Sequence, residues 1–233
     1  MTTTALTTIR RVRPSSLQLA EECPLAPYLS TVYPASHVNT REGLSVDGQV
    51  TTILKSLLWG DTSDLPTDDE ILPETEKILE WLERTYPIEQ WEYLVQERVE
   101  LLDPETGETL TAGTPDLLCL HRTRPIIVDI DWKKRGQMWA GHMKKPDDNM
   151  QQLAYVAAAW LKYSLIRKIE TAKVVLACWD ANGVTPLESS DIGEDRLAEI
   201  VDRIRAVPPV DLDKPRPEAA VGEHCLHCYQ RMH

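Results

Sequence analysis

The sequence predicts an α/β protein in which helices flank a mixed β-sheet. Three strand-like segments come in succession, and a long helix separates them from a fourth. Residues 91–102 alternate apolar and polar side chains, residues 108–121 follow the turn DPETGE, and residues 125–132 form the mostly apolar run typical of a buried strand. The long helix is expected over residues 147–165 and the fourth strand over residues 172–180. This order favours a mixed sheet covered by helices.

Further helices are expected before and after this series of strands. They include a Ser-capped helix and a helix that ends before Pro87, and we predict them at residues 14–30, 43–59, 73–86 and 191–206. We therefore expect one domain over residues 14–206, with its core at about 73–182. A flexible arm (1–13) should precede it, and a Pro-rich linker (207–220) should lead to a Cys/His tail (221–233) that packs back on the domain.

Composition and charge narrow the classes of function. The chain of 233 residues is 42% hydrophobic and 27% charged, an ordinary balance for a globular protein. Its net charge of −12 argues against a passive nucleic-acid coat, because such proteins bind phosphates through excess Lys and Arg. No apolar run is long enough to cross a membrane, and the N-terminus lacks the apolar core of a secretory signal. We therefore expect a cytoplasmic protein without a membrane partner.

Carboxylates and a lysine are predicted to share one face of the sheet. Asp131 and Lys133 lie two residues apart on the predicted buried strand, so their side chains point the same way, and Asp129 shares that face. Asp116 follows the turn AGTPD on the neighbouring strand. Mg²⁺ and Mn²⁺ prefer carboxylate oxygens, and a nearby lysine can orient or deprotonate an attacking water. An isolated Asp-x-Lys is more often a structural ion pair, so the surrounding motifs decide the interpretation.

Four segments follow one another along the chain in this order: SSLQLAEECPLAPYL, AGTPDLL, IIVDIDWKK and MQQLAYVAAAWL. From about residue 14 to the C-terminus, they resemble the RecB-like branch of the PD-(D/E)XK nucleases, including its CRISPR-associated members. The resemblance implies a restriction-endonuclease-like core, Mg²⁺ or Mn²⁺ as cofactor and DNA as partner. It implies the following catalytic residues: Asp116, Asp131, Lys133, Gln151 and Tyr155.

One position departs from the family pattern. Many relatives carry G-x-x-x-H in the second helix, with the histidine as a metal ligand, whereas the matching stretch here is GLSVD and ends at Asp47. Asp47 can bind Mg²⁺ or Mn²⁺ through oxygen together with Asp116 and Asp131, or it can be an ordinary solvent-facing residue. A basic run follows the proposed site, and we expect it either to bind DNA or to form a solvated face: Lys134, Arg135, Lys144 and Lys145.

Cysteines suggest a second site. Cys225 and Cys228 form a CxxC pair, and Cys23 lies in the first predicted helix. Relatives often hold a 4Fe–4S cluster with one early and three late cysteines, but here the third late position would be residue 234. A longer chain, a histidine ligand such as His233, His224 or His227, a zinc site and free thiols all remain open. Cys119 and Cys178 lie in apolar strands and are expected in the core.

The leading hypothesis is a DNA exonuclease that acts on single strands or strand ends. Recombination, repair or phage DNA metabolism in a bacterial, archaeal or phage-infected cell would suit it. The sequence lacks the phosphate-binding motif GxxxxGK[S/T], so a helicase or recombination protein would be a separate partner. A non-catalytic nucleic-acid-binding or assembly protein that keeps the fold is the main alternative, and an RNA-directed nuclease is a third hypothesis.

Overall fold

The protein is built around a mixed β-sheet of five strands. The structure is a computed structural model, and it describes residues 9–32, 41–60, 62–135, 144–220 and 222. The strands are, in spatial order, β2 (Trp91–Val95), β5 (Leu117–His121), β6 (Ile126–Lys134), β7 (Thr171–Asp180) and β8 (Gly183–Glu188). The β6–β7 pair is parallel and the other pairs are antiparallel. The predicted α/β class with a mixed sheet is therefore confirmed.

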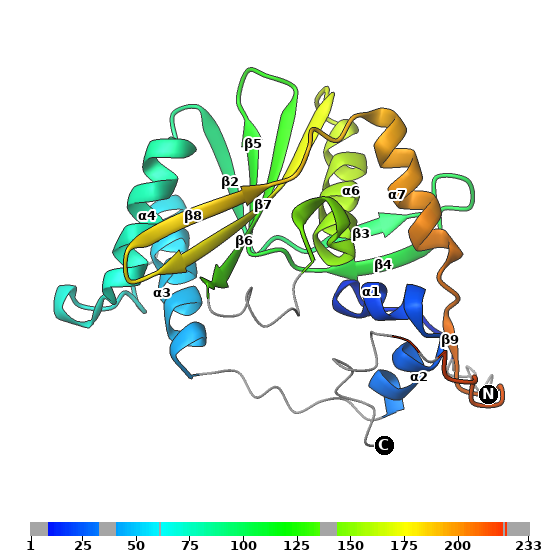
Figure 1. Cartoon of the computed structure of the whole chain (residues 1–233). Helices are drawn as coiled ribbons and strands as arrows, with labels where there is room; N and C mark the ends of the chain where they lie inside the picture. The colour runs from blue at the N-terminus through cyan, green and yellow to red at the C-terminus, as the bar shows by residue number, and fades with distance from the viewer. Residues whose placement is uncertain (1–8, 33–40, 61, 136–143, 221, 223–233) are drawn as a thin grey trace, which may run out of the picture.

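Helices cover both faces of the sheet (Figure 1). One face packs against α3 (Arg41–Trp59) and α4 (Pro73–Thr85), and the other packs against α6 (Met150–Ser164), with α7 (Glu194–Ala206) beside it. The period of two along β6 separates the faces. Val128, Ile130 and Trp132 pack with α3 and α4, whereas Ile127 packs with α6. Asp129, Asp131 and Lys133 follow Ile127 in this alternation, so they belong to the α6 side.

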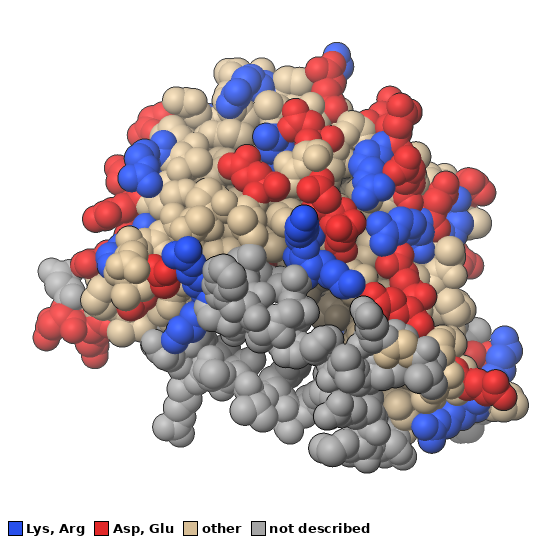
Figure 2. Space-filling model, in the orientation of Figure 1, with Lys and Arg blue, Asp and Glu red and all other residues tan. Residues whose placement is uncertain are grey.

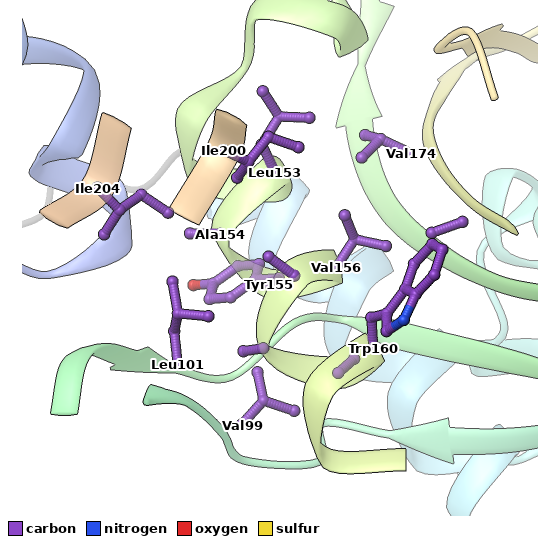
Figure 3. Packing of buried hydrophobic residues seen from close by; sticks show 14 of the residues in the cluster. Val99, Leu101, Leu153, Ala154, Tyr155, Val156, Trp160, Val174, Ile200 and Ile204 are labelled. Atoms are coloured by element: carbon purple, nitrogen blue, oxygen red, sulfur yellow. The ribbon is translucent and has the colours of Figure 1, made fainter. Parts of the chain in front are cut away.

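Helix α6 is the most buried helix in the described part of the chain, and it matches the predicted helix 147–165. Its polar start, Asn149, caps the first turn by accepting a bond from the backbone N–H of Gln152 at 3.4 Å. Apolar side chains surround the helix, as expected of a helix inside a core. Figure 3 shows Tyr155, Val156 and Trp160 among residues from β3 and α7: Val99, Leu101, Ile200 and Ile204.

A second, two-stranded sheet packs on α6. It consists of β3 (Val99–Leu102) and β4 (Thr109–Gly113), which are joined by the predicted DPETGE turn. The prediction of three continuous strands was therefore wrong: segments 91–102 and 108–121 each divide between the two sheets. The first division lies at Gln96, whose φ of 49° is left-handed and ends the extended strand β2.

The N-terminal prediction also needs correction, because residues 14–30 form two helices. These are α1 (Pro14–Glu22) and α2 (Leu25–Val32), and Cys23 between them has an extended backbone with φ −150° and ψ 111°. Pro24 explains the break, since a proline disfavours the helical conformation of the residue before it.

Three strands were not predicted. β8 is an edge strand that contains Pro186, a residue that edge positions tolerate because one side of the strand needs no hydrogen bonds. β1 (Ile9–Arg10) and β9 (Val210–Asp211) pair antiparallel and so join the segments predicted as arm and linker.

The surface carries both signs of charge. Figure 2 shows Asp and Glu side chains spread over the visible face with Lys and Arg between them, in keeping with the net charge of −12. In the part of the chain that the structure describes, no helix combines the length and the apolar character needed to cross a membrane.

The role of α6 is tested by truncating one of its buried side chains. Leu153 is fully buried in the main core, so Leu153→Ala should lower the free energy of unfolding by about 2–5 kcal/mol. Leu165 directly follows the same helix and is 85% exposed, so Leu165→Ala should change the free energy of unfolding by less than about 0.5 kcal/mol. Denaturant unfolding compares the two, and equal losses would contradict the burial of α6.

Candidate active site

The predicted carboxylates and lysine come together at the C-terminal end of β6. Leu117 pairs with Ile130, so Asp116, one residue before β5, lies beside Asp131 on the neighbouring strand. The backbone N–H of Trp132 donates to Oδ2 of Asp116 at 3.2 Å. The break between β4 and β5 therefore places the Asp116 carboxylate against the backbone of β6.

Asp131 is buried, and both of its carboxylate oxygens have partners. Oδ2 forms an ion pair with Nζ of Lys133, and Oδ1 accepts a bond of 2.8 Å from Nε2 of Gln152 on α6. Burying a carboxylate without such partners would cost several kcal/mol. Lys133 and Gln152 thus hold the Asp131 carboxylate from two sides.

The contact from Gln152 was not predicted, because the family resemblance implied its neighbour Gln151. Gln151 instead hydrogen-bonds the Tyr155 side chain one turn later on α6. Gln152 is 1% exposed, among apolar and aromatic residues of α6. A buried amide requires a hydrogen-bond partner, and that requirement was the signal in the sequence that could have identified it.

Tyr155 explains the glycine of the AGTPDLL segment, Gly113. A Cβ added to Gly113 would lie 2.6 Å from Cε1 of Tyr155 and 3.0 Å from its hydroxyl oxygen. The Cγ of Pro14, in α1, would lie 3.0 Å from the same added Cβ. The missing side chain at Gly113 lets α6 and α1 approach β4, just before the chain reaches Asp116.

Asp47 lies at the same site rather than on a solvent-facing surface. It is partly buried on α3, and the charges of Lys133 and Asp131 both act on it. Burial raises its pKa to about 6, the attraction of Lys133 lowers it in part, and the repulsion of Asp131 adds to the rise. Among the described residues, its Oδ1 has no hydrogen-bond partner. Asp47 therefore brings an available oxygen to the site.

Burial and like charges raise the pKa values of two other acids, Asp116 and Asp129. Burial and then the charge of Asp131 raise the pKa of Asp116 to about 7, although Lys133 and the Trp132 N–H act in the opposite direction. Asp129 is fully buried, and no described residue hydrogen-bonds either carboxylate oxygen. Burial, followed by the charges of Asp131 and Asp116, raises the pKa of Asp129 well above its ordinary value. The protonated form of Asp129 is therefore favoured over its carboxylate.

Lys133 stays charged. Burial alone lowers the pKa of its ammonium group, but the attraction of Asp131, Asp116 and Asp47 outweighs burial and raises that pKa above its ordinary value. One ammonium thus faces three carboxylates that can ionise. The site has an excess of negative charge, which a cation would neutralise.

The described ranges contain no group of three or more His, Cys, Asp or Glu side chains arranged to hold one metal ion. Mg²⁺ differs from zinc in that it is commonly bound by one or two protein carboxylates, with water and substrate phosphates as further ligands. Asp116 and Asp131 satisfy that requirement, and Asp47 can add to it.

The predicted DNA-binding residues do not form a single free patch. The Nζ of Lys134 lies 5.7 Å from the ring centroid of Trp179, and Arg135 pairs with Asp180 at 2.9 Å. Lys144 reaches Glu22 at 3.5 Å, and Lys145 is exposed. Contact of these four residues with DNA remains a prediction.

Cysteine ligation also remains a prediction. Cys225, Cys228 and His233 lie outside the described residues. Cys23 is a buried free thiol packed with Leu25, Ala26 and Leu29. Cys119 and Cys178 are buried in the sheet, as expected.

Comparisons with known proteins identify no family for this chain, so the interpretation of the site rests on its geometry. The chain matches no protein-family model. No curated protein matches it. One similar solved structure is the crystal structure of a protein called SSO0001; that protein is 13% identical with a TM-score of 0.31, and the alignment covers 91% of this chain and 90% of that one. A likeness of this size supports no conclusion about fold or function.

The burial of Asp116 and the charge of Asp131 predict a pH-dependent stability. Its pKa of about 7 in the folded protein exceeds the ordinary 3.8, so the folded chain holds this proton more tightly than the unfolded chain. The stability contributed by this group is complete below pH of about 4 and is lost as pH rises through about 7. Relative to Asp116→Asn, the wild type should lose up to about 1.4 kcal/mol per pH unit in this interval.

Metal-free denaturant unfolding at several pH values measures this difference. Asp195→Asn, at an exposed acid in the first turn of α7, is the matched control. A wild-type stability that, relative to Asp116→Asn, stays constant or rises with pH would contradict the raised pKa of Asp116.

Proposed function

We propose that this protein is a metal-dependent nuclease of the PD-(D/E)XK type that hydrolyses DNA single strands or strand ends. The observation that carries the proposal is the convergence of Asp116 and Asp131, from two neighbouring strands, beside the ammonium of Lys133. A structural ion pair needs only one of these acids. The second acid raises the electrostatic cost of the site and is useful where a cation binds.

The donor set fits Mg²⁺ or Mn²⁺. Asp116 and Asp131 would hold the ion through carboxylate oxygens, and Asp47 would add an oxygen that has no partner among the described residues. The raised pKa of Asp116 reflects its burial and, second, repulsion from Asp131, which a divalent cation would offset. When bound, such an ion stabilises negative charge on the phosphoryl oxygens and lowers the pKa of a coordinated water.

The residues of the chain have separate roles in this proposal. Lys133 acts as a cation, because its raised pKa leaves little neutral amine to serve as a base. Its ammonium can donate to the attacking water or to a phosphate oxygen and offset negative charge there. Gln152 is a positioning residue that orients Asp131 through their 2.8 Å bond. Tyr155 packs closely against Gly113, and Gln151 hydrogen-bonds the Tyr155 side chain.

A non-catalytic nucleic-acid-binding or assembly protein is the second candidate. The ion pair between Lys133 and Asp131 favours it, since that pair and the bond from Gln152 satisfy the buried carboxylate without a metal. Metal-dependent cleavage separates the two candidates.

Cleavage should depend on both the metal and Lys133. We expect end-labelled single- or double-stranded DNA to be degraded with Mn²⁺ or Mg²⁺ and to survive in EDTA. Lys133→Met and Asp131→Asn should each slow cleavage at least about 100-fold, because charge neutralisation and metal binding are lost. Asp195→Asn should retain the wild-type rate. Unchanged cleavage by Lys133→Met, or cleavage in EDTA, would exclude the proposed site. Labelled RNA in a parallel reaction tests the third hypothesis, an RNA-directed nuclease.

The two adjacent glutamines provide a sharper comparison. Gln152→Ala removes the donor to Asp131 and should raise the Mn²⁺ concentration needed for half-maximal cleavage by about tenfold or more. Gln151→Ala removes a contact to Tyr155 and should have a smaller effect on that concentration. A larger effect from Gln151→Ala would show that the sequence motif, rather than the contact in this structure, identifies the functional glutamine.

A further inference from the structure

A cavity of about 540 Å³ lies at the end of the sheet opposite the proposed active site. It is formed by the connection between β5 and β6, the start of β2 and the residues just before β7. Figure 1 shows that the β5–β6 connection and the C-terminal end of β6 lie at opposite edges of the sheet. The cavity is therefore separate from Asp131 and Lys133.

The lining of this cavity is positively charged, although the chain as a whole is acidic. It carries four basic and two acidic side chains: Arg122, Arg124, Arg167, Lys168, Glu92 and Glu170. Both acids are already paired, Glu92 with Arg167 and Glu170 with Lys168. Within the described ranges, Arg122 and Arg124 form no ion pair. Two uncompensated guanidinium groups thus face one cavity on a protein with a net charge of −12.

The two arginines are held in place by other contacts. Nε of Arg122 donates to the carbonyl of Ile88 at 3.2 Å, and its backbone N–H donates to the carbonyl of Gln90 at 2.8 Å. The guanidinium carbon of Arg124 lies 5.8 Å from the ring centroid of Trp91, a buried residue. Anchoring reduces the entropy lost when the guanidinium groups bind an anion, and their planar forks suit phosphate oxygens.

His121 supports the same arrangement. Its Nδ1 accepts bonds from the backbone N–H groups of Thr123 and Arg124 at 3.1 and 3.0 Å, which fixes the turn that carries both arginines. Burial and the charge of Arg124 lower the pKa of His121, which favours the neutral ring. Because Nδ1 accepts, the ring proton is on Nε2, and His121 adds a neutral donor to the lining.

We propose that this cavity binds a phosphate-bearing anion of nucleotide size, with Arg122 and Arg124 as its principal ligands. The volume falls within the range of small-molecule sites. A phosphate monoester carries close to two negative charges at neutral pH and matches the two unpaired guanidinium groups. Its source is either a free nucleotide or the terminal phosphate of a nucleic-acid strand. The site is independent of the proposed nuclease function.

Calorimetric titration in EDTA tests the cavity with deoxythymidine monophosphate and with a short oligonucleotide carrying a 5′-phosphate or a 5′-hydroxyl. The combined change Arg122→Gln and Arg124→Gln should weaken phosphate binding at least about tenfold, since each bond to a charged group contributes a comparable factor. Both residues are exposed on a turn, and a thermal melt checks that the variant folds. Arg84→Gln, at an exposed arginine of α4 outside the cavity, should bind as the wild type does.

The pattern of binding also identifies the source of the phosphate. Tighter binding of the 5′-phosphorylated oligonucleotide than of the 5′-hydroxyl form and the mononucleotide would identify a strand end, and binding of the mononucleotide alone would identify a free nucleotide. The Asp131→Asn variant should bind each phosphate probe with the affinity of the wild type. Absence of binding by every phosphate probe, undiminished binding by the double variant, or loss in Asp131→Asn would overturn the proposal.

Discussion

The interaction on which the candidate site depends is the ion pair between Lys133 and Asp131 at the end of β6. Asp131 is buried and has Asp116 as a charged neighbour, so without the ammonium the two carboxylates would repel each other in a poorly solvated place. The same carboxylates hold the Lys133 proton and raise its pKa. Each group therefore stabilises the charge of the other, and the balance still leaves an excess of negative charge for a cation.

The rest of the fold serves to bring these groups together. Division of the predicted long strands places β2 and β5 in the main sheet and β3 and β4 under α6, and Asp116 lies where the second division occurs. Helix α6 packs against β3 and β6 and carries Gln152 to the carboxylate of Asp131. Close packing of Tyr155 on Gly113 fixes the approach of α6 to β4. The position of α6 thus affects both the core and the site.

Much of this arrangement could be predicted from local patterns. The apolar run over residues 125–132 identifies β6, and the period of two places Asp131 and Lys133 on one face. The helix 147–165 could be predicted because apolar residues recur throughout it. Two features of the sheets escaped prediction for local reasons. Gln96 adopts a positive φ without being glycine, so no residue type marks the break, and β8 is a partly buried edge strand with a weak pattern.

Tertiary contacts account for the other misses. Gln151 and Gln152 differ by about 100° around the helix axis, and only the packing of α6 against β6 decides which one meets Asp131. The basic cavity combines side chains from β2, the β5–β6 turn and the segment before β7. Residues so far apart in sequence leave no local motif.

Calorimetric titration of Mn²⁺ into the metal-free protein at pH 7, repeated in buffers of different ionisation enthalpy, tests the central claim most directly. Because the pKa of Asp116 is raised to about 7, the account predicts binding accompanied by proton release, with the release reduced in Asp116→Asn and binding lost in Asp131→Asn. Absence of Mn²⁺ binding by the folded wild type, or equal binding by Asp131→Asn, would contradict the assignment of this site as a metal centre.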